Sequence, residues 1–88
     1  MVIERFRNSD WRPIGERFQR SGRMLPEGLT YHSSWVDSCG GRCFQIMETA
    51  RPELLKTWAS RWDDLIDFEM VPVETSAEFW ARAHRGSA

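Results

Sequence analysis

Four polar side chains that could share a binding or catalytic site fall on one predicted hairpin and one later strand. His32, Ser34 and Gln45 belong to the hairpin, and Glu69 belongs to the later strand. A carboxylate can orient an imidazole that moves a proton near neutral pH, and an amide can donate a hydrogen bond to a developing oxyanion. We therefore predict Ser34, Gln45, Glu69 and His32 as ligand-binding residues. His32 is the one candidate base, and no catalytic residue is assigned.

The hairpin also carries two cysteines and two glycines whose spacing invites other chemistry. Cys39 and Cys43 form a C-x₃-C pair, but zinc sites normally need four closely spaced ligands. A hairpin loop of even length would also turn the two thiols to opposite faces. Gly40 and Gly41 precede no helix, and a phosphate loop depends on a helix N-terminus, so they predict a tight turn. We expect no metal site and no cofactor.

The elements that position these residues follow the order strand, helix, strand, strand, helix, strand. Strands are predicted over 2–6, 29–37, 42–48 and 66–73. One helix follows Asp10, which can cap it, and stops at Gly22; another runs from Pro52 to about Trp62 with an amphipathic spacing. This order predicts an α+β class, a ferredoxin-like β-α-β-β-α-β domain over residues 1–73. Its sheet would be four-stranded and antiparallel, with two helices on one face.

Residues 74–88 are predicted as a C-terminal helix and tail. Thr75 and Glu78 have the S/T-x-x-E spacing of a capping box. Trp80 has no obvious place in the core of its own chain, and we assign it to a partner subunit. Trp35, Trp58 and Trp62 are predicted in the core.

Side chains alternate along a strand, so each predicted strand can be divided between two faces. The face under the helices is predicted to hold Leu29, Tyr31, Trp35, Phe44, Ile46, Ile66, Phe68 and Met70. The uncovered face is predicted to hold His32, Ser34, Val36, Cys43, Gln45, Met47, Asp67, Glu69, Val71 and Val73. The first strand mixes apolar and charged residues on both faces and is left unassigned. The half-polar uncovered face is expected to be a dimer interface or the wall of a pocket.

Size and charge narrow the class of protein. With 88 residues the chain forms one small domain, and its five Trp and five Phe favour burial in a homodimer interface. A formal net charge of −1 and the lack of a basic stripe argue against nucleic acid as a partner. No basic leader precedes an apolar run, and no stretch reaches the roughly 20 apolar residues that span a bilayer. We expect a cytoplasmic protein with free thiols and no membrane partner.

Several stretches resemble a bacterial family known only as domain of unknown function 3303. They are MVIERF at 1–6, GRMLPEGL at 22–29, SWVD at 34–37, RCFQIME at 42–48, Trp58 with WDDL at 62–65, and DFEMVPV at 67–73. The resemblance implies the dimeric α/β-barrel superfamily, in which two ferredoxin-like sheets pack around a central cavity. That superfamily includes cofactor-independent oxygenases and a lactone isomerase. Arg51 departs from the pattern, because an acidic residue is expected before Pro52.

These observations predict an uncharacterised homodimer with a cavity for a small organic molecule on the uncovered sheet face. Whether it is an enzyme stays open. One alternative is a cofactor-independent oxygenase- or isomerase-like enzyme with His32 as base. Another is a protein-interaction module that docks through its C-terminal helix, around Phe79 and Trp80.

Overall fold

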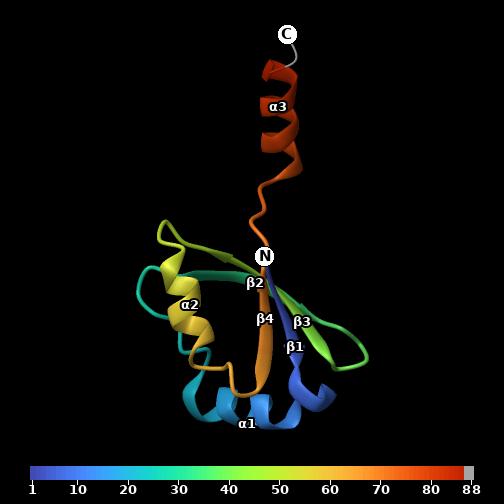
Figure 1. Ribbon diagram of the computed structural model, residues 1–88, viewed down its shortest axis with the longest axis vertical. Helices are drawn as coiled ribbons and strands as arrows, with labels where there is room; N and C mark the ends of the chain where they lie inside the picture. Colours follow the sequence, from blue (N-terminus) through green and yellow to red (C-terminus); the bar gives the residue numbers. More distant parts are fainter. Residues whose placement is uncertain (87–88) are drawn as a thin grey trace.

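Four strands form one antiparallel sheet in the computed structural model, which describes residues 1–86 (Figure 1). The strands are β1 (Val2–Phe6), β2 (Thr30–Val36), β3 (Arg42–Glu48) and β4 (Ile66–Met70). Their order across the sheet is β2-β3-β1-β4, so β3 and β1 are central. The α+β class and the antiparallel four-stranded sheet are confirmed. The last two residues of the predicted 74–88 tail lie outside the described range.

The helices are α1 (Arg12–Ser21), α2 (Glu53–Ala59) and α3 (Ser76–Gly86), with a short 3₁₀ turn, η1 (Arg7–Ser9), after β1. The start of α1 is supported by the Asp10 carboxylate, which accepts a hydrogen bond from the amide of Arg12 at 3.1 Å. Its end is set by Gly22, whose φ of 66° lies in the left-handed region. The predicted stop at Gly22 is confirmed, whereas Asp10 supports the first turn from one residue before the N-cap, which is Trp11. No helix among the described residues has the length and apolar content needed to cross a membrane.

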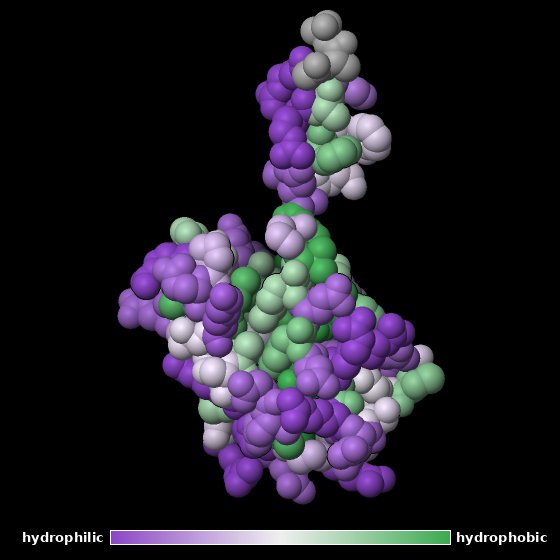
Figure 2. All heavy atoms as spheres, in the orientation of Figure 1, coloured by the Kyte–Doolittle hydropathy of each residue, from purple (hydrophilic) through white to green (hydrophobic). Residues whose placement is uncertain are grey.

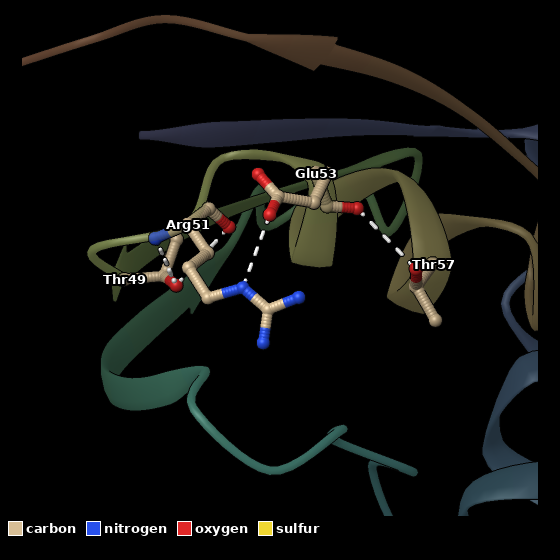
Figure 3. A network of polar contacts seen from close by, with 4 residues as sticks. All are labelled: Thr49, Arg51, Glu53 and Thr57. Atoms are coloured by element: carbon tan, nitrogen blue, oxygen red, sulfur yellow. Dashed lines mark hydrogen bonds and ion pairs between the residues drawn. The ribbon is translucent and has the colours of Figure 1, made fainter.

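A polar network begins α2 although no acidic residue precedes Pro52 (Figure 3). The Thr49 hydroxyl accepts from the amide of Arg51 at 3.0 Å, and the Arg51 guanidinium donates to Glu53 at 3.0 Å. Hydrogen bonding, including that from Arg51, holds the pKa of Glu53 below its usual range. An anionic residue in the first turn is favourable at the positive end of the helix dipole. Thr49 and Glu53 therefore stabilise the start of α2, although Arg51 stands where an acidic residue was expected.

One apolar cluster lies between the sheet and α2, together with the residues that directly follow α2. Its buried members are Val2, Phe6, Leu29, Cys43, Leu54, Trp58, Trp62 and Ile66. Trp58 and Trp62 are 1% and 3% exposed, so their predicted place in the core is confirmed. Trp35 is 58% exposed, so its predicted burial is wrong.

The pairing of the hairpin strands was predicted correctly, but the face that the helices cover was not. Ser34 pairs with Gln45 and Trp35 pairs with Phe44, as the alternation requires. However, Gln45 is 4% exposed and lies on the helix side. The cause is that β3 carries apolar side chains on both faces, so hydrophobicity alone does not orient it.

The register assigns each residue of the sheet to a face. The helix side carries Val2, Glu4, Phe6, Ser34, Val36, Cys43, Gln45, Met47, Ile66, Phe68 and Met70. The other side, called the open face from here on, carries Ile3, Arg5, Trp35, Phe44, Ile46, Asp67 and Glu69. A register shift between Tyr31 and Ser33 moves Tyr31 to the helix side, where it pairs with Met47. The predicted faces of β4 are correct for its core residues.

The helix α3 stands away from the rest of the molecule (Figure 1). One of the two hydrogen bonds of its predicted capping box is formed, because the Thr75 hydroxyl accepts from the amide of Glu78 at 3.1 Å. The radius of gyration is 15.4 Å, against about 12 Å expected for a compact chain of this length. Phe79 and Trp80 are 42% and 56% exposed, and α3 shows a polar side and an apolar side (Figure 2). Trp80 thus has no place in the core of its own chain.

Candidate ligand-binding pocket

A pocket of about 580 Å³ lies between α1 and the helix side of the sheet. It is lined by Ile14, Gly15 and Phe18 of α1 and by Trp11, the residue just before this helix. These apolar residues follow a helical spacing, yet no residue of α1 is buried. Ile14 packs partly buried against the core cluster, and the rest of the stripe borders the pocket. Its volume falls in the range of small-molecule sites.

The opposite wall is mainly aromatic and aliphatic. It is formed by Phe6, Val36, Trp58, Trp62 and Ile66. Most of these side chains belong to the core cluster, so the core itself holds this wall in place. Apolar walls provide the area that a small organic molecule buries on binding.

Two buried polar side chains, Glu4 and Gln45, form the floor of the pocket. They are each 4% exposed and come from the neighbouring central strands β1 and β3. The Gln45 amide nitrogen donates a hydrogen bond to the Glu4 carboxylate. Burial raises the pKa of Glu4 to about 7, although Arg23 and the Gln45 hydrogen bond oppose the shift. A carboxyl group in this pocket therefore changes its charge near neutral pH.

The carbonyl oxygen of the Gln45 side chain, Oε1, is buried and has no hydrogen-bond partner among residues 1–86. Leaving such an acceptor without a partner costs about 1–3 kcal/mol. Gln45 is also among the residues that line the pocket.

The core tryptophans fix Arg23 at the side of the pocket. The backbone carbonyl of Arg23 accepts the indole N–H of Trp58 at 2.9 Å and that of Trp62 at 3.1 Å. Its guanidinium lies over the Tyr31 ring, 3.7 Å from the ring centroid. The next residue, Met24, has a φ of 59° and its carbonyl accepts from Arg61 at 2.6 Å. This segment is therefore held at both its backbone and its side chain.

Cys43 also borders the pocket, opposite Glu4 in the β1–β3 register. Burial, followed by the charge of Glu4, raises the pKa of this thiol to about 11. The thiol is thus protonated and a poor nucleophile near neutral pH. Cys39 is exposed in the turn, and both cysteines are free.

The structure brings together two of the four predicted ligand-binding residues. Ser34 and Gln45 both line the pocket, and the Ser34 hydroxyl is 2.7 Å from the Tyr31 hydroxyl. His32 lies outside it, exposed and 2.8 Å from Glu48. Glu69 lies on the open face, where it pairs with Arg5 at 3.1 Å. The four residues therefore do not share the uncovered face, because Ser34 and Gln45 point to the helix side.

Glu4 and Arg23 were not predicted as site residues. The signal for Glu4 was present: it stands between Val2 and Phe6 on the same face of β1, and both neighbours are buried. A carboxylate between two apolar residues at i−2 and i+2 is a candidate for burial. The sequence carries no comparable signal for Arg23, because hydrogen bonds from the distant residues Trp58 and Trp62 position it.

Comparison with known proteins identifies one family. The sequence model of the family described as "Domain of unknown function (DUF3303)" matches residues 1–87. The match extends beyond residue 73 and so includes α3. No curated protein and no solved structure gives a match.

Proposed function

The chain belongs to the DUF3303 family, and from its geometry we propose that it is a small-molecule-binding protein whose site is the pocket between α1 and the sheet. One observation carries the proposal: the apolar stripe of α1 buries no residue and borders a cavity of about 580 Å³. An occupant that touched this stripe would bury it. The proposed site is on the helix side of the sheet, not on the uncovered face that the sequence suggested.

The burial of apolar surface supplies the affinity in this proposal. Trp11 and Phe18 are 56% and 44% exposed, so both have area left to bury. Each 100 Å² of apolar area removed from water contributes about 2.5 kcal/mol before the costs of association. Trp11 and Phe18 thus leave apolar area beside the pocket that a ligand can bury.

The experiment is a two-dimensional NMR titration with a panel of small aromatic compounds. Gly15 lines the pocket, and a Cβ added there meets nothing within 4 Å, so the side chain of Gly15→Leu is expected to extend into the cavity. We expect compounds to shift pocket resonances in the wild type and not in Gly15→Leu. The matched control is Gln19→Leu at an exposed position of α1. A panel without pocket shifts, or equal binding by Gly15→Leu, contradicts the proposal.

We also propose that the protein is a homodimer with the ferredoxin-like, split-βαβ arrangement. The strand order β2-β3-β1-β4 supports this fold. Ile3, Trp35, Phe44 and Ile46 give the open face an apolar centre, and the surface ion pairs Arg5–Glu69 and Arg7–Asp67 leave its charge balanced. A second copy of this neutral face is a fitting partner for it.

Light scattering tests the dimer. Trp35→Glu is expected to convert the dimer to a species of 10.4 kDa, because a charge would be buried in the interface without a partner. Gln19→Glu, which lies on α1, is expected to leave the mass unchanged. A wild-type mass equal to one chain over the micromolar range contradicts the proposed dimer.

A second candidate function is docking through α3, with a second copy of the chain as the occupant. The exposed side chains of Phe79 and Trp80 favour it, since these rings contact each other edge to face and leave one side of α3 unburied. In Figure 2 the apolar band over the sheet continues toward the base of α3. We expect Phe79→Ser with Trp80→Ser to weaken dimerisation. An unchanged dissociation constant would remove α3 from the interface.

The thiols support the cytoplasm as the place of this function. Cys39 is free and exposed. Such thiols persist where glutathione and thioredoxin keep the compartment reducing. Cell fractionation tests this location, and a periplasmic or secreted protein would contradict it.

A further inference from the structure

The floor of the pocket offers a ligand hydrogen-bond acceptors. When Glu4 is ionised it can only accept, so the Gln45 amide must turn its nitrogen toward the carboxylate. The other end of the same amide, Oε1, then remains without a partner among the described residues. Only 4% of the surface of Gln45 is exposed. Burial of an unpaired acceptor is what a ligand donor would correct.

The charges around the floor argue for a neutral ligand. Arg23, Asp37 and Cys43 line the pocket with Glu4, and Cys43 carries no charge near neutral pH. The lining thus carries charges of both signs, so a charged ligand would be repelled by either Arg23 or the carboxylates of Glu4 and Asp37 while it is attracted by the other. Because an unpaired charge in a largely apolar site is costly, a neutral molecule fits best.

The walls argue for an aromatic body. Phe18 comes from α1 and Trp11 from just before it, and Trp58 and Trp62 border the opposite side. Aromatic rings gain about 0.5–1.5 kcal/mol per contact with other aromatic rings beyond the area buried. An aliphatic ligand of the same size would lack this contribution.

We propose that the pocket binds a neutral aromatic molecule that donates an N–H or O–H hydrogen bond to the Gln45 side-chain oxygen. This inference rests on the proposed binding function of the same pocket, and it specifies the chemical class of the ligand. Glu4 acts as a positioning residue, because its carboxylate fixes which end of the Gln45 amide faces the ligand.

The test uses indole and benzofuran, which have nearly the same shape. Indole carries an N–H donor, whereas benzofuran has an oxygen in its place. By calorimetry or NMR titration at pH 8 we expect indole to bind at least about tenfold more tightly, the value of one hydrogen bond to a buried acceptor. In Gln45→Met the ratio of the two dissociation constants should approach one. Gln19→Met on the outer side of α1 is the control and should keep the tenfold ratio.

The outcomes separate this inference from the proposed function. If neither compound binds, the pocket proposal fails and this inference fails with it. If both bind with equal affinity, or benzofuran binds better, the binding function stands and the donor assignment is overturned. The wild-type ratio decides the question even if Gln45→Met does not fold.

The pH dependence of the ratio gives a further readout that a purely structural role of Glu4 would not move. Below a pKa of about 7, Glu4 is protonated and can itself donate to Gln45, in competition with the ligand. The preference for indole should therefore fall between pH 8 and pH 5.5. A ratio that stays level or rises on acidification would overturn the proposed arrangement of donor and acceptor.

Discussion

The two helices on the sheet have similar amphipathic patterns but different surroundings. The helix α2 buries Leu54 and Trp58 in the core, whereas α1 buries no residue. The apolar stripe of α1 faces the pocket, and that of α2 faces the sheet. Amphipathic spacing thus tells which side of a helix avoids water, but not whether protein or ligand covers that side.

The attachments of the two helices differ in the same way. Trp58 in α2 and Trp62 just after it are anchored by burial and by hydrogen bonds to the Arg23 carbonyl. A bidentate ion pair at the surface holds α1: the Arg17 guanidinium donates to the two carboxylate oxygens of Asp64 at 2.7 and 2.6 Å. Apolar packing stabilises α2, while α1 is attached by this ion pair and by Ile14, which is partly buried and packs against the core cluster.

The largest expected effect is the difference in folding stability between a variant in α2 and a variant in α1. Trp58→Ala should destabilise the fold by about 3–5 kcal/mol, because it removes a fully buried ring. Phe18→Ala should cost less than about 1 kcal/mol, since Phe18 is 44% exposed, yet it should weaken binding in the pocket. Urea unfolding measures both. Equal losses of stability would show that α1 packs as α2 does.

The next effect concerns the floor under α1 and depends on pH. The pKa of Glu4 is raised to about 7 from 4.5, so between these values the folded state binds more protons than the unfolded state. Stability should therefore fall as the pH rises from about 4.5 to about 7, by an amount on the order of 3 kcal/mol, and stay level above that range.

Thermal unfolding at several pH values checks this slope. Glu4→Gln should remove it and raise stability at pH 8, because no charge is then buried. The control Glu16→Gln, at an exposed site on α1, should keep the wild-type slope. A wild-type protein whose stability rises over the same pH range would contradict the assignment.

A smaller effect should come from Gly15, inside α1. A Cβ at this position meets no atom within 4 Å, so Ala should fit without strain. Gly15→Ala is expected to raise stability by about 0.5–1 kcal/mol through helix propensity. The melting temperature measures the change. A loss of stability would mean that the space beside Gly15 is too small for a methyl group.

The smallest effect should come from the ion pair that holds α1. Its hydrogen bond to Arg17 holds the pKa of Asp64 below the usual range, but Asp64 is largely exposed, and exposed pairs contribute little. Arg17→Met should therefore change the melting temperature less than the variants above. Faster amide exchange confined to α1 is the expected readout. Faster exchange in α2 as well would show that the helices are not independent.

The sequence allowed the pairs of the hairpin to be predicted but not its orientation. An even loop fixes Ser34 against Gln45 and Trp35 against Phe44. Which pair lies under the helices depends on the register of β3 against β1, where Val2 pairs with Gln45. That register is a long-range contact, and local alternation carries no information about it.

The candidate site was predictable only in part for a related reason. Ser34 and Gln45 were found because polar residues on strands stand out. Val2 and Phe6 mark Glu4 as a candidate for burial, but both faces of its strand mix apolar and charged residues, so its side was left unassigned. Arg23 is positioned by Trp58 through its backbone. Contacts between segments distant in the chain therefore decide which polar residues share the pocket, and the sequence does not show these contacts.

The two tryptophans that share the carbonyl of Arg23 can report on the pocket through their fluorescence. Two indole N–H groups, from Trp58 and Trp62, end on this one oxygen, and both rings also border the pocket. The emission of an indole responds to its N–H hydrogen bond and to the polarity around its ring. An occupant of the pocket would change the polarity beside the rings. The native fluorescence of the unlabelled protein can thus signal when the pocket fills.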